Sequence, residues 1–292
     1  MKNFCTVADI NFYNRVCALE CSLSEFNKEY KLHLLCLDRK IEEKIKNNNI
    51  ICYHLDDIIN NDRHLKAALD HPPSREALIH AQGDIKNAKK FQFIWALSAY
   101  FSWWTLENLE IEDILYIDAD IFFFSGLDEL YSKIFKEEIS IGIVEHRCPY
   151  NPDNGKYNVG IVYFKNDLEG YKCSTWWKNC LITTNHDYYK THSGCGDQKY
   201  LELFPKLFRK VGVLDKFIGH LAPWNFNFHQ YNEKIIWNNV AQDLLYCHFS
   251  NFKIYEEKYD LAPRHGFVNP PNNFIKNIAN KYFECLKRFP CD

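Results

Sequence analysis

Apolar segments of strand length alternate with stretches of helical periodicity along the first half of the chain. The strand-like segments lie at residues 4–8, 32–37, 50–53, 114–117, 140–144 and 159–164. The helical stretches lie at residues 11–23 and 91–109 and in the segment that follows Asp167. Strands that alternate with helices usually form parallel sheets. The pattern therefore predicts an α/β fold, with a mostly parallel, twisted sheet and helices on both faces.

The remaining segments are less regular. Residues 56–90 and 183–196 are polar and lack periodicity, and long loops of this kind often cover a substrate. We find no repeat or clear linker, so we expect one domain over residues 1–253 and an extension over residues 254–292. An amphipathic helix in the extension predicts packing on the domain, with an anionic membrane surface as the alternative partner. Its apolar stripe consists of Phe274, Ile275, Ile278, Tyr282, Phe283 and Leu286.

The overall composition narrows the class of protein. A net charge of −3 over 292 residues provides no basic field of the kind that nucleic-acid binders use. The twelve cysteines are scattered and include no Cys-x-x-Cys pair, which is typical of reduced core cysteines in a cytosolic protein. We expect no secretory leader before the strand at Phe4, and no apolar stretch approaches the roughly 18 residues of a membrane-spanning helix. We therefore expect a soluble, cytoplasmic protein.

Two carboxylates follow the apolar segment 114–117. Side chains alternate along an extended backbone, so Asp118 and Asp120 face the same way at the carboxyl end of a buried strand. That edge of an open α/β sheet is where ligands bind. Two neighbouring anions repel each other, and burying them is costly unless a cation or a proton relieves the repulsion. The pair therefore predicts a divalent metal that carries a phosphorylated ligand; the alternative is a strand-end pair that caps the next turn.

Four further segments carry residues suited to the same chemistry. Residues 9–13 follow the first strand and offer a carboxylate, an amide and aromatic rings. Tyr157-Asn158-Val159-Gly160 opens a strand in which the glycine permits close backbone approach to a ligand. Gly196-Asp197-Gln198 starts a helix with a carboxylate and an amide. Finally, His248 ends a strand five residues before Lys253.

Taken together and in this order, these segments resemble the nucleotide-sugar glycosyltransferases of the GT-A fold. The resemblance is closest to the retaining family 8 type, which includes glycogenin and bacterial lipopolysaccharide galactosyltransferases. It covers roughly residues 4–253 and rests on the Asp-Ala-Asp, Asn-Val-Gly, Gly-Asp-Gln and His-Phe-Ser-Asn-Phe-Lys motifs. Each motif alone is weak, whereas the ordered set is specific for the fold and the activity class and much less so for the sugar.

The resemblance implies a metal site. Asp118 and Asp120 would bind Mn²⁺ (or Mg²⁺), and His248 would be the third protein ligand. The chemistry agrees, because a carboxylate pair with one imidazole favours Mn²⁺ over Mg²⁺, which prefers oxygen ligands alone.

The resemblance also implies a binding site for the nucleotide of a UDP-sugar. Asp9 and Asn11 would hydrogen-bond the uracil or the ribose, with Phe12 or Tyr13 stacking on the base. Lys253 would neutralise the departing diphosphate.

The donor sugar has its own set of implied contacts. Asn158 and Gly160 would line the sugar site, and Asp197 and Gln198 would lie beside the anomeric carbon. Because an amide is weakly nucleophilic, Gln198 is a poor covalent nucleophile. We therefore favour front-face attack, with the leaving phosphate oxygen taking the proton of the acceptor.

The chain departs from the family pattern in two places. The family usually has an arginine on the helix before the Asp-x-Asp strand, but residues 93–106 contain no arginine or lysine, so Lys89 or Lys90 would have to substitute. Near the end of the resemblance, Asn251 replaces a glycine and Lys253 falls one position early.

The implied function is metal-dependent transfer of a hexosyl group from a UDP-sugar to a hydroxyl, with retention of configuration. The acceptor would be a glycan, a glycolipid or a protein, in bacterial surface-glycan assembly at the inner membrane face. One alternative is a sugar-phosphate nucleotidyltransferase, although residues 9–13 lack the glycine and the cation of the phosphate loop of those enzymes. Another is a carbohydrate-binding relative without catalytic activity.

Several residues have a structural interpretation beside the functional one. His248 alone suits a buried structural histidine, and Asp197 suits a helix cap. Trp224 lies in a turn and is a candidate for the floor of an acceptor site. The pair Trp176-Trp177 suggests helix packing more than sugar stacking. His186, His192 and Cys195 invite a zinc interpretation, but their spacing fits no familiar zinc site.

Overall fold

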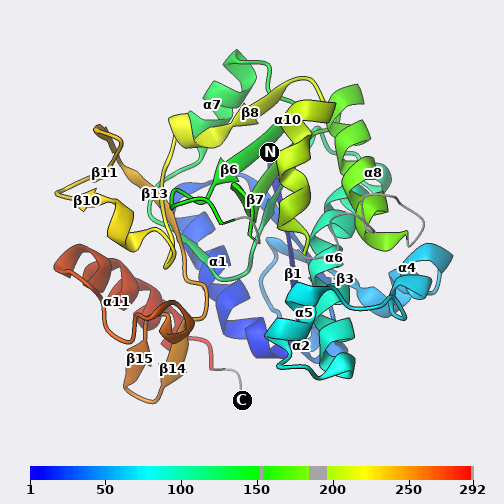
Figure 1. Ribbon diagram of the computed structural model, residues 1–292, viewed down its shortest axis with the longest axis horizontal. Helices are drawn as coiled ribbons and strands as arrows, with labels where there is room; N and C mark the ends of the chain where they lie inside the picture. The colour runs from blue at the N-terminus through cyan, green and yellow to red at the C-terminus, as the bar shows by residue number, and fades with distance from the viewer. Residues whose placement is uncertain (152–153, 184–195, 291–292) are drawn as a thin grey trace.

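The computed structural model describes residues 1–151, 154–183 and 196–290. Its centre is a seven-stranded sheet in the order β3-β2-β1-β4-β7-β6-β8 (Figure 1). The strands are β1 (Lys2–Ala8), β2 (Tyr30–Cys36), β3 (Ile50–His54), β4 (Asp113–Ile117), β6 (Ile141–Glu145), β7 (Tyr157–Lys165) and β8 (Val211–Val213). Strand β7 is antiparallel to β4 and β6, and the other pairs are parallel. The mostly parallel sheet predicted from the sequence is confirmed.

Helices cover both faces of this sheet, as predicted. Helices α6 (Ile85–Asn108) and α8 (Leu168–Ile182) supply one core layer, and α1 (Tyr13–Phe26) and α7 (Asp128–Lys136) supply the other. Successive strand residues enter different layers, because side chains alternate along a strand. Phe4 and Leu34 belong to the layer with α1, whereas Cys5 and Leu35 belong to the layer with α6.

The prediction of an irregular segment over residues 56–90 was wrong. The structure has α3 (Leu55–Ile59), α4 (Arg63–Ala68), α5 (Arg75–His80) and the first turn of α6 there. The last three start at capping side chains, since Asp62, Ser74 and Asp84 accept hydrogen bonds from backbone amides of the first helical turn. Helices of five or six residues are too short to display an apolar period, which is why the pattern missed them. Most of the second predicted loop, residues 184–195, lies outside the described residues.

A second sheet of three strands packs beside the first. It consists of β5 (Ile121–Phe123), β13 (Leu244–His248) and β9 (Gly219–Leu221), in the order β5-β13-β9. Smaller elements complete the fold: α2 (Arg39–Lys44), α10 (Phe204–Leu207), β10 (Gln230–Tyr231), β11 (Ile235–Trp237), β12 (Val240–Gln242), β14 (Lys253–Tyr255) and β15 (Lys258–Asp260), with five 3₁₀ helices among the described residues.

The C-terminal helix α11 (Asn273–Lys287) buries its apolar stripe in the protein. The ring of Tyr282 stacks on Phe249 with centroids 4.1 Å apart. Ile275, Ile278 and Leu286 pack in the same cluster. This stripe is therefore occupied by the domain and is not free to enter a membrane. Within the described residues, no helix combines the length and the apolar composition needed to cross a membrane.

Candidate metal and donor site

Strand β4 ends where the two sheets meet, and backbone hydrogen bonds hold its end in place. The amide of Asp118 donates to Gly160 O of β7 at 2.9 Å, and the chain then turns through Asp120 into β5. Strand β5 pairs antiparallel with β13, with Ile121 opposite His248. The amide of Phe249 donates to Asp120 O at 2.9 Å. This pairing brings His248 beside the two aspartates although the sequence separates them widely.

The side chains of Asp118, Asp120 and His248 converge at this point. Their ligand atoms all lie within 4.8 Å of one another. His248 Nε2 lies 2.9 Å from Asp120 Oδ1 and 3.7 Å from Asp118 Oδ2. All three are largely shielded from solvent, with side-chain exposures of 26%, 18% and 8% respectively. The predicted cluster of Asp118, Asp120 and His248, called the metal triad below, is therefore present in the structure.

The electrostatics of this metal triad reflect two buried anions that share one cation. Burial raises the pKa of Asp118, and the charge of Asp120 adds to the rise against the influence of His248. Burial also acts to raise the pKa of Asp120, but the charge and hydrogen bond of His248 outweigh it and lower that pKa. The pKa of His248 is raised, because the two aspartates outweigh its burial. Such a set is poised for a divalent cation, which would neutralise both carboxylates at once.

Two neighbours orient the metal triad. The hydroxyl of Tyr116 donates to Asp118 Oδ1 at 2.8 Å. Gly160 leaves room for the imidazole of His248: a Cβ at this position would lie 2.7 Å from His248 Nδ1 and 2.7 Å from Asn158 Oδ1. Gly160 therefore acts here through the packing of a ligand side chain.

The structure brings the Asn-Val-Gly and Gly-Asp-Gln motifs together. Asn158 Oδ1 accepts from the amide of Gly160 at 2.8 Å, and its Nδ2 donates to Gln198 Oε1 at 3.4 Å. Asp197 precedes Gln198 and is buried, but its side chain caps no helix. The structural interpretation of Asp197 as a helix cap is thus wrong.

The predicted nucleotide segment follows β1 as a 3₁₀ turn. Asp9 Oδ1 accepts from the amide of Asn11 at 3.1 Å, and its Oδ2 accepts from Asn11 Nδ2 at 3.2 Å. Phe12 is 40% exposed, whereas Tyr13 packs against the core and has Lys44 Nζ 4.8 Å from its ring centre. Of the two rings, Phe12 is the more available for stacking.

Arg15, on the first turns of α1, is a site residue that the sequence reasoning missed. Its Nη2 donates to Phe252 O at 3.0 Å and its Nη1 to Asn11 O at 3.4 Å. The guanidinium lies 4.8 Å from the ring centre of Phe12, and its charge helps to lower the pKa of Asp120. The only sequence signal was an arginine one helical turn after Asn11. Arg15 therefore links the nucleotide segment, the loop after β13 and the metal triad.

The loop after His248 explains one departure from the family pattern. Asn251 has φ +62°, a left-handed conformation that glycine adopts freely and asparagine tolerates better than most residues. Asn251 thus adopts a backbone conformation that is also open to glycine. Lys253 is exposed and begins β14, opposite Asp260 in the hairpin. Its role at a diphosphate stays a prediction.

Lys89 and Lys90, the predicted substitutes for the family arginine, lie on the N-terminal half of α6.

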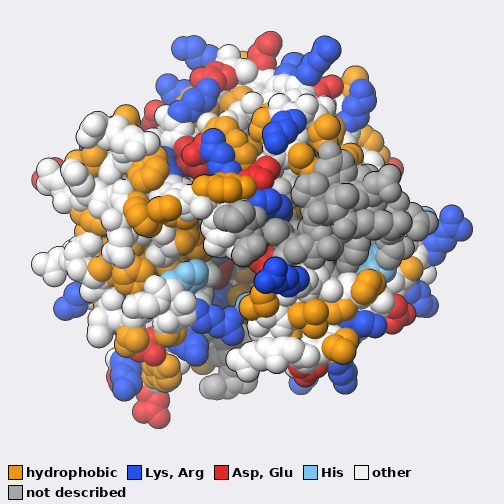
Figure 2. Space-filling model, viewed as in Figure 1, with side chains coloured by type: hydrophobic (Ala, Val, Ile, Leu, Met, Phe, Trp, Pro, Cys, Tyr) orange, Lys and Arg blue, Asp and Glu red, His pale blue; other side chains and the backbone are white. Residues whose placement is uncertain are grey.

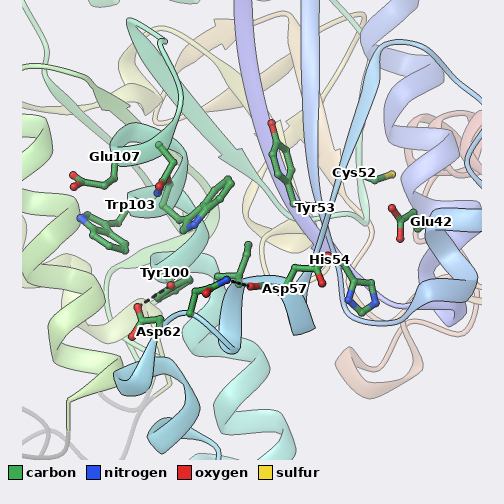
Figure 3. A pocket seen from close by; sticks show the side chains of 13 residues that line it. Glu42, Cys52, Tyr53, His54, Asp57, Asp62, Tyr100, Trp103 and Glu107 are labelled. Carbon is green, nitrogen blue, oxygen red and sulfur yellow. Dashed lines mark hydrogen bonds between the residues drawn. The ribbon is translucent and has the colours of Figure 1, made fainter.

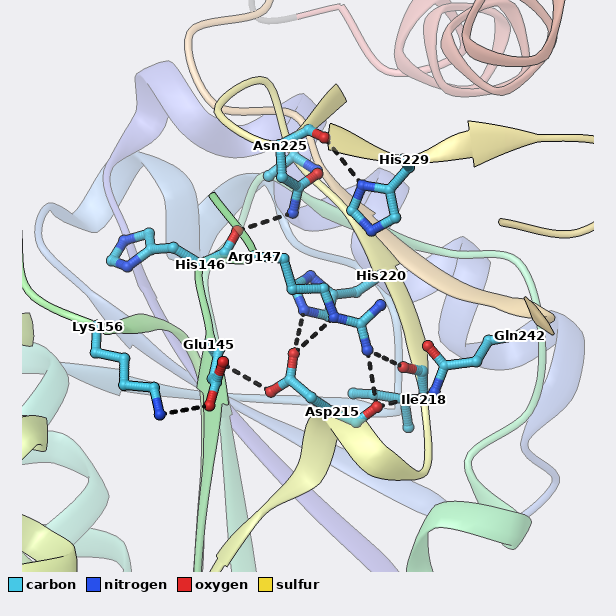
Figure 4. Close-up of polar contacts among 11 residues, drawn as sticks. Glu145, His146, Arg147, Lys156, Asp215, Ile218, His220, Asn225, His229 and Gln242 are labelled. Carbon is cyan, nitrogen blue, oxygen red and sulfur yellow. Dashed lines mark hydrogen bonds and ion pairs between the residues drawn. The ribbon is translucent and has the colours of Figure 1, made fainter. Parts of the chain in front are cut away.

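A buried polar network fixes the segment that carries Trp224. Arg147 Nε donates to Asp215 Oδ1 at 2.8 Å, and His220 Nε2 lies 2.8 Å from the same oxygen (Figure 4). Asn225 Nδ2 donates to His146 O at 3.0 Å. The Trp224 ring lies edge-on to His248 at 5.1 Å and to His146 at 5.6 Å between ring centres. Trp224 therefore borders the metal triad.

A pocket of about 640 Å³ lies elsewhere, at the free edge of β3 (Figure 3). Its walls combine acids with the aromatic side chains of Tyr53, Tyr100, Trp103 and Trp104. None of the predicted site residues lines it.

On the molecular face in Figure 2, basic side chains are spread among acidic, apolar and neutral ones.

Other sequence interpretations can also be placed. Trp177 is fully buried, and its indole Nε1 donates to Asp197 O at 3.1 Å; Trp176 packs on Tyr200 and Phe204. The pair therefore serves helix packing, as predicted. His186, His192 and Cys195 lie outside the described residues.

Comparison with known proteins identifies the fold. The structure aligns with mouse xyloside xylosyltransferase 1 at a TM-score of 0.55 and 14% identity, over 85% of this chain and 97% of the other. It aligns with galactosyltransferase LgtC, in complex with donor and acceptor sugar analogues, at a TM-score of 0.54 and 11% identity, over 98% and 96% of the two chains. The chain thus has the GT-A glycosyltransferase fold that its motifs predicted.

Sequence comparison finds relatives in Bacillus subtilis. Two Bacillus subtilis (strain 168) proteins, YfnD and YfnF, are both described as uncharacterized. YfnD is 23% identical over 98% of this chain and 89% of its own length, and YfnF is 24% identical over 86% and 82%. No protein-family model matches the chain.

Proposed function

We propose that this protein is a metal-dependent glycosyltransferase that moves a hexosyl group from a UDP-sugar to a hydroxyl acceptor with retention of configuration. The observation that carries the proposal is the cluster of Asp118, Asp120 and His248 at the carboxyl end of β4 in a GT-A fold. Residues 1–253 would form the transferase domain, and residues 254–292 the extension packed on it. The cellular role would be bacterial surface-glycan assembly on the cytoplasmic side of the membrane.

The metal triad suits Mn²⁺, with Mg²⁺ as the alternative. Two carboxylate oxygens and an imidazole nitrogen lie close enough to bind one ion, and burial together with the charge of Asp120 raises the pKa of Asp118. When bound, the metal would stabilise the charge that develops on the departing diphosphate. Tyr116 would keep Asp118 oriented, and Gly160 would keep His248 in place.

The nucleotide would bind along the segment after β1. Asp9 and Asn11 offer polar groups for the uracil or the ribose, and the exposed ring of Phe12 offers a stacking surface. Arg15 lies between this segment and the triad, so its guanidinium would face the diphosphate. Lys253 would add a second cation after a movement of its exposed side chain.

The sugar would lie against the Asn158 and Gly160 backbone, with Asp197 and Gln198 near the anomeric carbon. The hydrogen bond between Asn158 and Gln198 supports one shared role for the two motifs. Gln198 would orient the sugar, and the leaving phosphate oxygen would take the proton of the acceptor hydroxyl. Trp224 borders the triad on the side of His146 and would form the floor for a glycan, glycolipid or protein acceptor.

The alternatives are a sugar-phosphate nucleotidyltransferase and a non-catalytic carbohydrate-binding relative. The first expects a glycine-rich, cationic loop after β1, whereas residues 9–13 form an Asx-type 3₁₀ turn without glycine. The second expects decay of the metal ligands, and all three are present.

A thermal-shift screen of UDP, GDP and CMP, each with and without Mn²⁺, tests the proposal. A ligand stabilises the native state in proportion to its occupancy, so UDP with Mn²⁺ should raise Tm the most. A larger Tm shift with GDP would refute the uridine assignment. Equal Tm shifts with UDP in Mn²⁺ and in EDTA would refute the role of the metal in binding. Release of UDP from a UDP-hexose then separates an enzyme from a binding protein.

A further inference from the structure

The carboxyl group of Asp197 occupies an unusual environment for an acid. Ser98, on α6, lies with its Oγ 2.7 Å from Asp197 Oδ2, and the contact is buried. From α8, the indole of Trp177 donates to the backbone carbonyl of Asp197. The preceding residue is held by Glu76 of α5, whose carboxylate accepts from the amide of Gly196. Apolar and polar groups thus enclose Asp197 from three helices.

The hydrogen bonds of Ser98 determine where a proton must lie. Ser98 Oγ is 2.7 Å from Trp95 O as well as 2.7 Å from Asp197 Oδ2. A hydroxyl has one hydrogen to donate. If Asp197 is ionised, both neighbours of Ser98 are acceptors and one of the two short contacts lacks a hydrogen. If Asp197 is protonated, it donates to Ser98 Oγ, Ser98 donates to Trp95 O, and both contacts are satisfied.

The surrounding charges favour the protonated state. The charged groups that act on Asp197 are Asp118, after β4, and Glu76, on α5, and both are acids. Tyr116, on β4, also lies within the influence of Asp197 and stays a neutral phenol, since burial raises its pKa far above the usual value. Burial is the main cause that raises the pKa of Asp197 to about 8, and the two acids add to it; only a hydrogen bond donated by Ser98 would act in the opposite direction.

We propose that Ser98 is a positioning residue that holds Asp197 as a neutral carboxylic acid. Residues 93–106 of α6 carry no cation that would compensate the charge of an ionised Asp197. A neutral Asp197 adds no negative charge beside Asp118 and an incoming diphosphate. It also presents a fixed carboxyl group to the sugar. The catalytic part of this inference rests on the proposed function, whereas the protonation state does not.

The protonation state is tested on the donor-free protein, without any activity assay. An unfolded aspartate has an ordinary pKa near 4, so between about pH 4 and pH 8 the native state would bind one proton more than the unfolded state. The stability contributed by Asp197 therefore falls as pH rises through this window and levels off above it. Asp197→Asn removes the proton exchange and leaves a neutral side chain of the same shape.

The measurement is urea unfolding of the wild type and Asp197→Asn at several pH values from 5 to 9. We expect the stability of the variant relative to the wild type to grow as pH rises to about 8 and then to stay constant. A difference that is constant from pH 5 to pH 8 would overturn the proposal, because Asp197 would then be ionised throughout. Should the variant not fold, infrared spectroscopy of the wild type provides the test. The proposal predicts a protonated carboxyl band at pH 6 that is lost at pH 9.5, and absence of this band at pH 6 would overturn it.

The positioning role is tested by substitutions on α6. Ser98→Ala should lower kcat about tenfold, as expected for one lost buried hydrogen bond, with the KM for the donor and the affinity for UDP nearly unchanged. Ser98→Thr, which keeps the hydroxyl, should recover most of the loss. Ser102→Ala is the matched control, because Ser102 is buried one turn later and donates to Ser98 O, away from Asp197. Equal losses in Ser98→Ala and Ser102→Ala, or no recovery with threonine, would overturn the role.

The two failures are distinguishable. A wild-type protein that releases no UDP from any UDP-hexose would refute the proposed function and leave the unfolding result standing. If the wild type is an active transferase but the difference in unfolding free energy between it and Asp197→Asn does not change with pH, only the neutral state of Asp197 is refuted.

Discussion

The pocket at the edge of β3 and the metal triad are both rich in acids, but the negative charge of their carboxylates is balanced in different ways. In the pocket at the edge of β3, Asp57 pairs with Arg39 at 3.4 Å, and Asp62 accepts from the hydroxyl of Tyr100 at 2.9 Å. Glu107 accepts from Tyr171, and Lys178 lies 3.7 Å from the ring centre of Trp103. In the metal triad, Asp118 and Asp120 share the imidazole of His248, with a hydrogen bond from Tyr116 to Asp118 and the charge of Arg15 acting on Asp120.

This difference indicates which region awaits a ligand. The acids of the pocket already have partners within the protein and gain little from an added cation. The metal triad holds two largely buried carboxylates against the charges of His248 and Arg15, whereas the side chain of Asp57 in the pocket is 70% exposed. Burial of incompletely balanced charge is costly. The balance of charge and burial therefore favours the metal triad as the site of chemistry.

The strongest test of this contrast removes one carboxylate from each region. Asp120→Ala should lower UDP-hexose turnover on the order of 10²-fold or more, because a group that stabilises developing charge is lost. Asp57→Ala, in the pocket, should leave turnover within about twofold, since exposed ion pairs contribute little. UDP release under saturating donor and Mn²⁺ measures both. Equal effects of the two substitutions on turnover would contradict the assignment of the chemistry to the metal triad.

The arginines of the two regions provide a second, smaller test. Arg15→Met should weaken UDP binding about tenfold, the typical loss for a hydrogen bond to a charged group. Arg39→Met removes the partner of Asp57 and should not change UDP affinity. Isothermal titration with UDP and Mn²⁺ compares the variants. An unchanged affinity in Arg15→Met would assign Arg15 to the support of the loop at Phe252 alone.

Gly160 allows a third test, on the geometry of the metal triad. A Cβ at Gly160 would meet His248 and Asn158 at 2.7 Å, so Gly160→Ala should displace the imidazole. We expect the free energy of unfolding to fall by about 1 kcal/mol or more and Mn²⁺ affinity to fall with it. Gly126→Ala is the control, because its Cβ would make contacts no closer than 3.4 Å. If Gly160→Ala binds Mn²⁺ like the wild type, then His248 is not held by this contact.

Periodicity and motif order were enough to predict much of the molecule. The strands at residues 4–8, 32–37 and 50–53 are β1, β2 and β3 within two residues at either end. Buried strands and long helices repeat their apolar pattern often enough to be recognised. The Asp118 and Asp120 pair was predictable from its place after a buried strand, whereas His248 was predicted as the third ligand only through the family resemblance.

The contacts that the sequence did not predict join distant segments. Arg15 bonds to Phe252, 237 residues away, and Ser98 bonds to Asp197, 99 residues away. Neither serine nor arginine at these positions has a distinctive local pattern, so only the packing of α1 and α6 reveals their partners. The helices within residues 55–80 were missed for a different reason, since capping side chains define them more than apolar periodicity does.

The role of the metal triad in glycosyl transfer can be tested by following the stereochemistry and the metal dependence of the reaction in one experiment. Proton NMR can follow the wild type and Asp120→Ala with α-linked UDP-hexoses, Mn²⁺ and simple glycan acceptors. We expect the wild type to form UDP and an α-glycoside as the first product, EDTA to stop the reaction, and Asp120→Ala to be slower on the order of 10²-fold. Formation of a β-glycoside would contradict retention, and transfer that persists in EDTA or in Asp120→Ala would contradict the role of the metal triad.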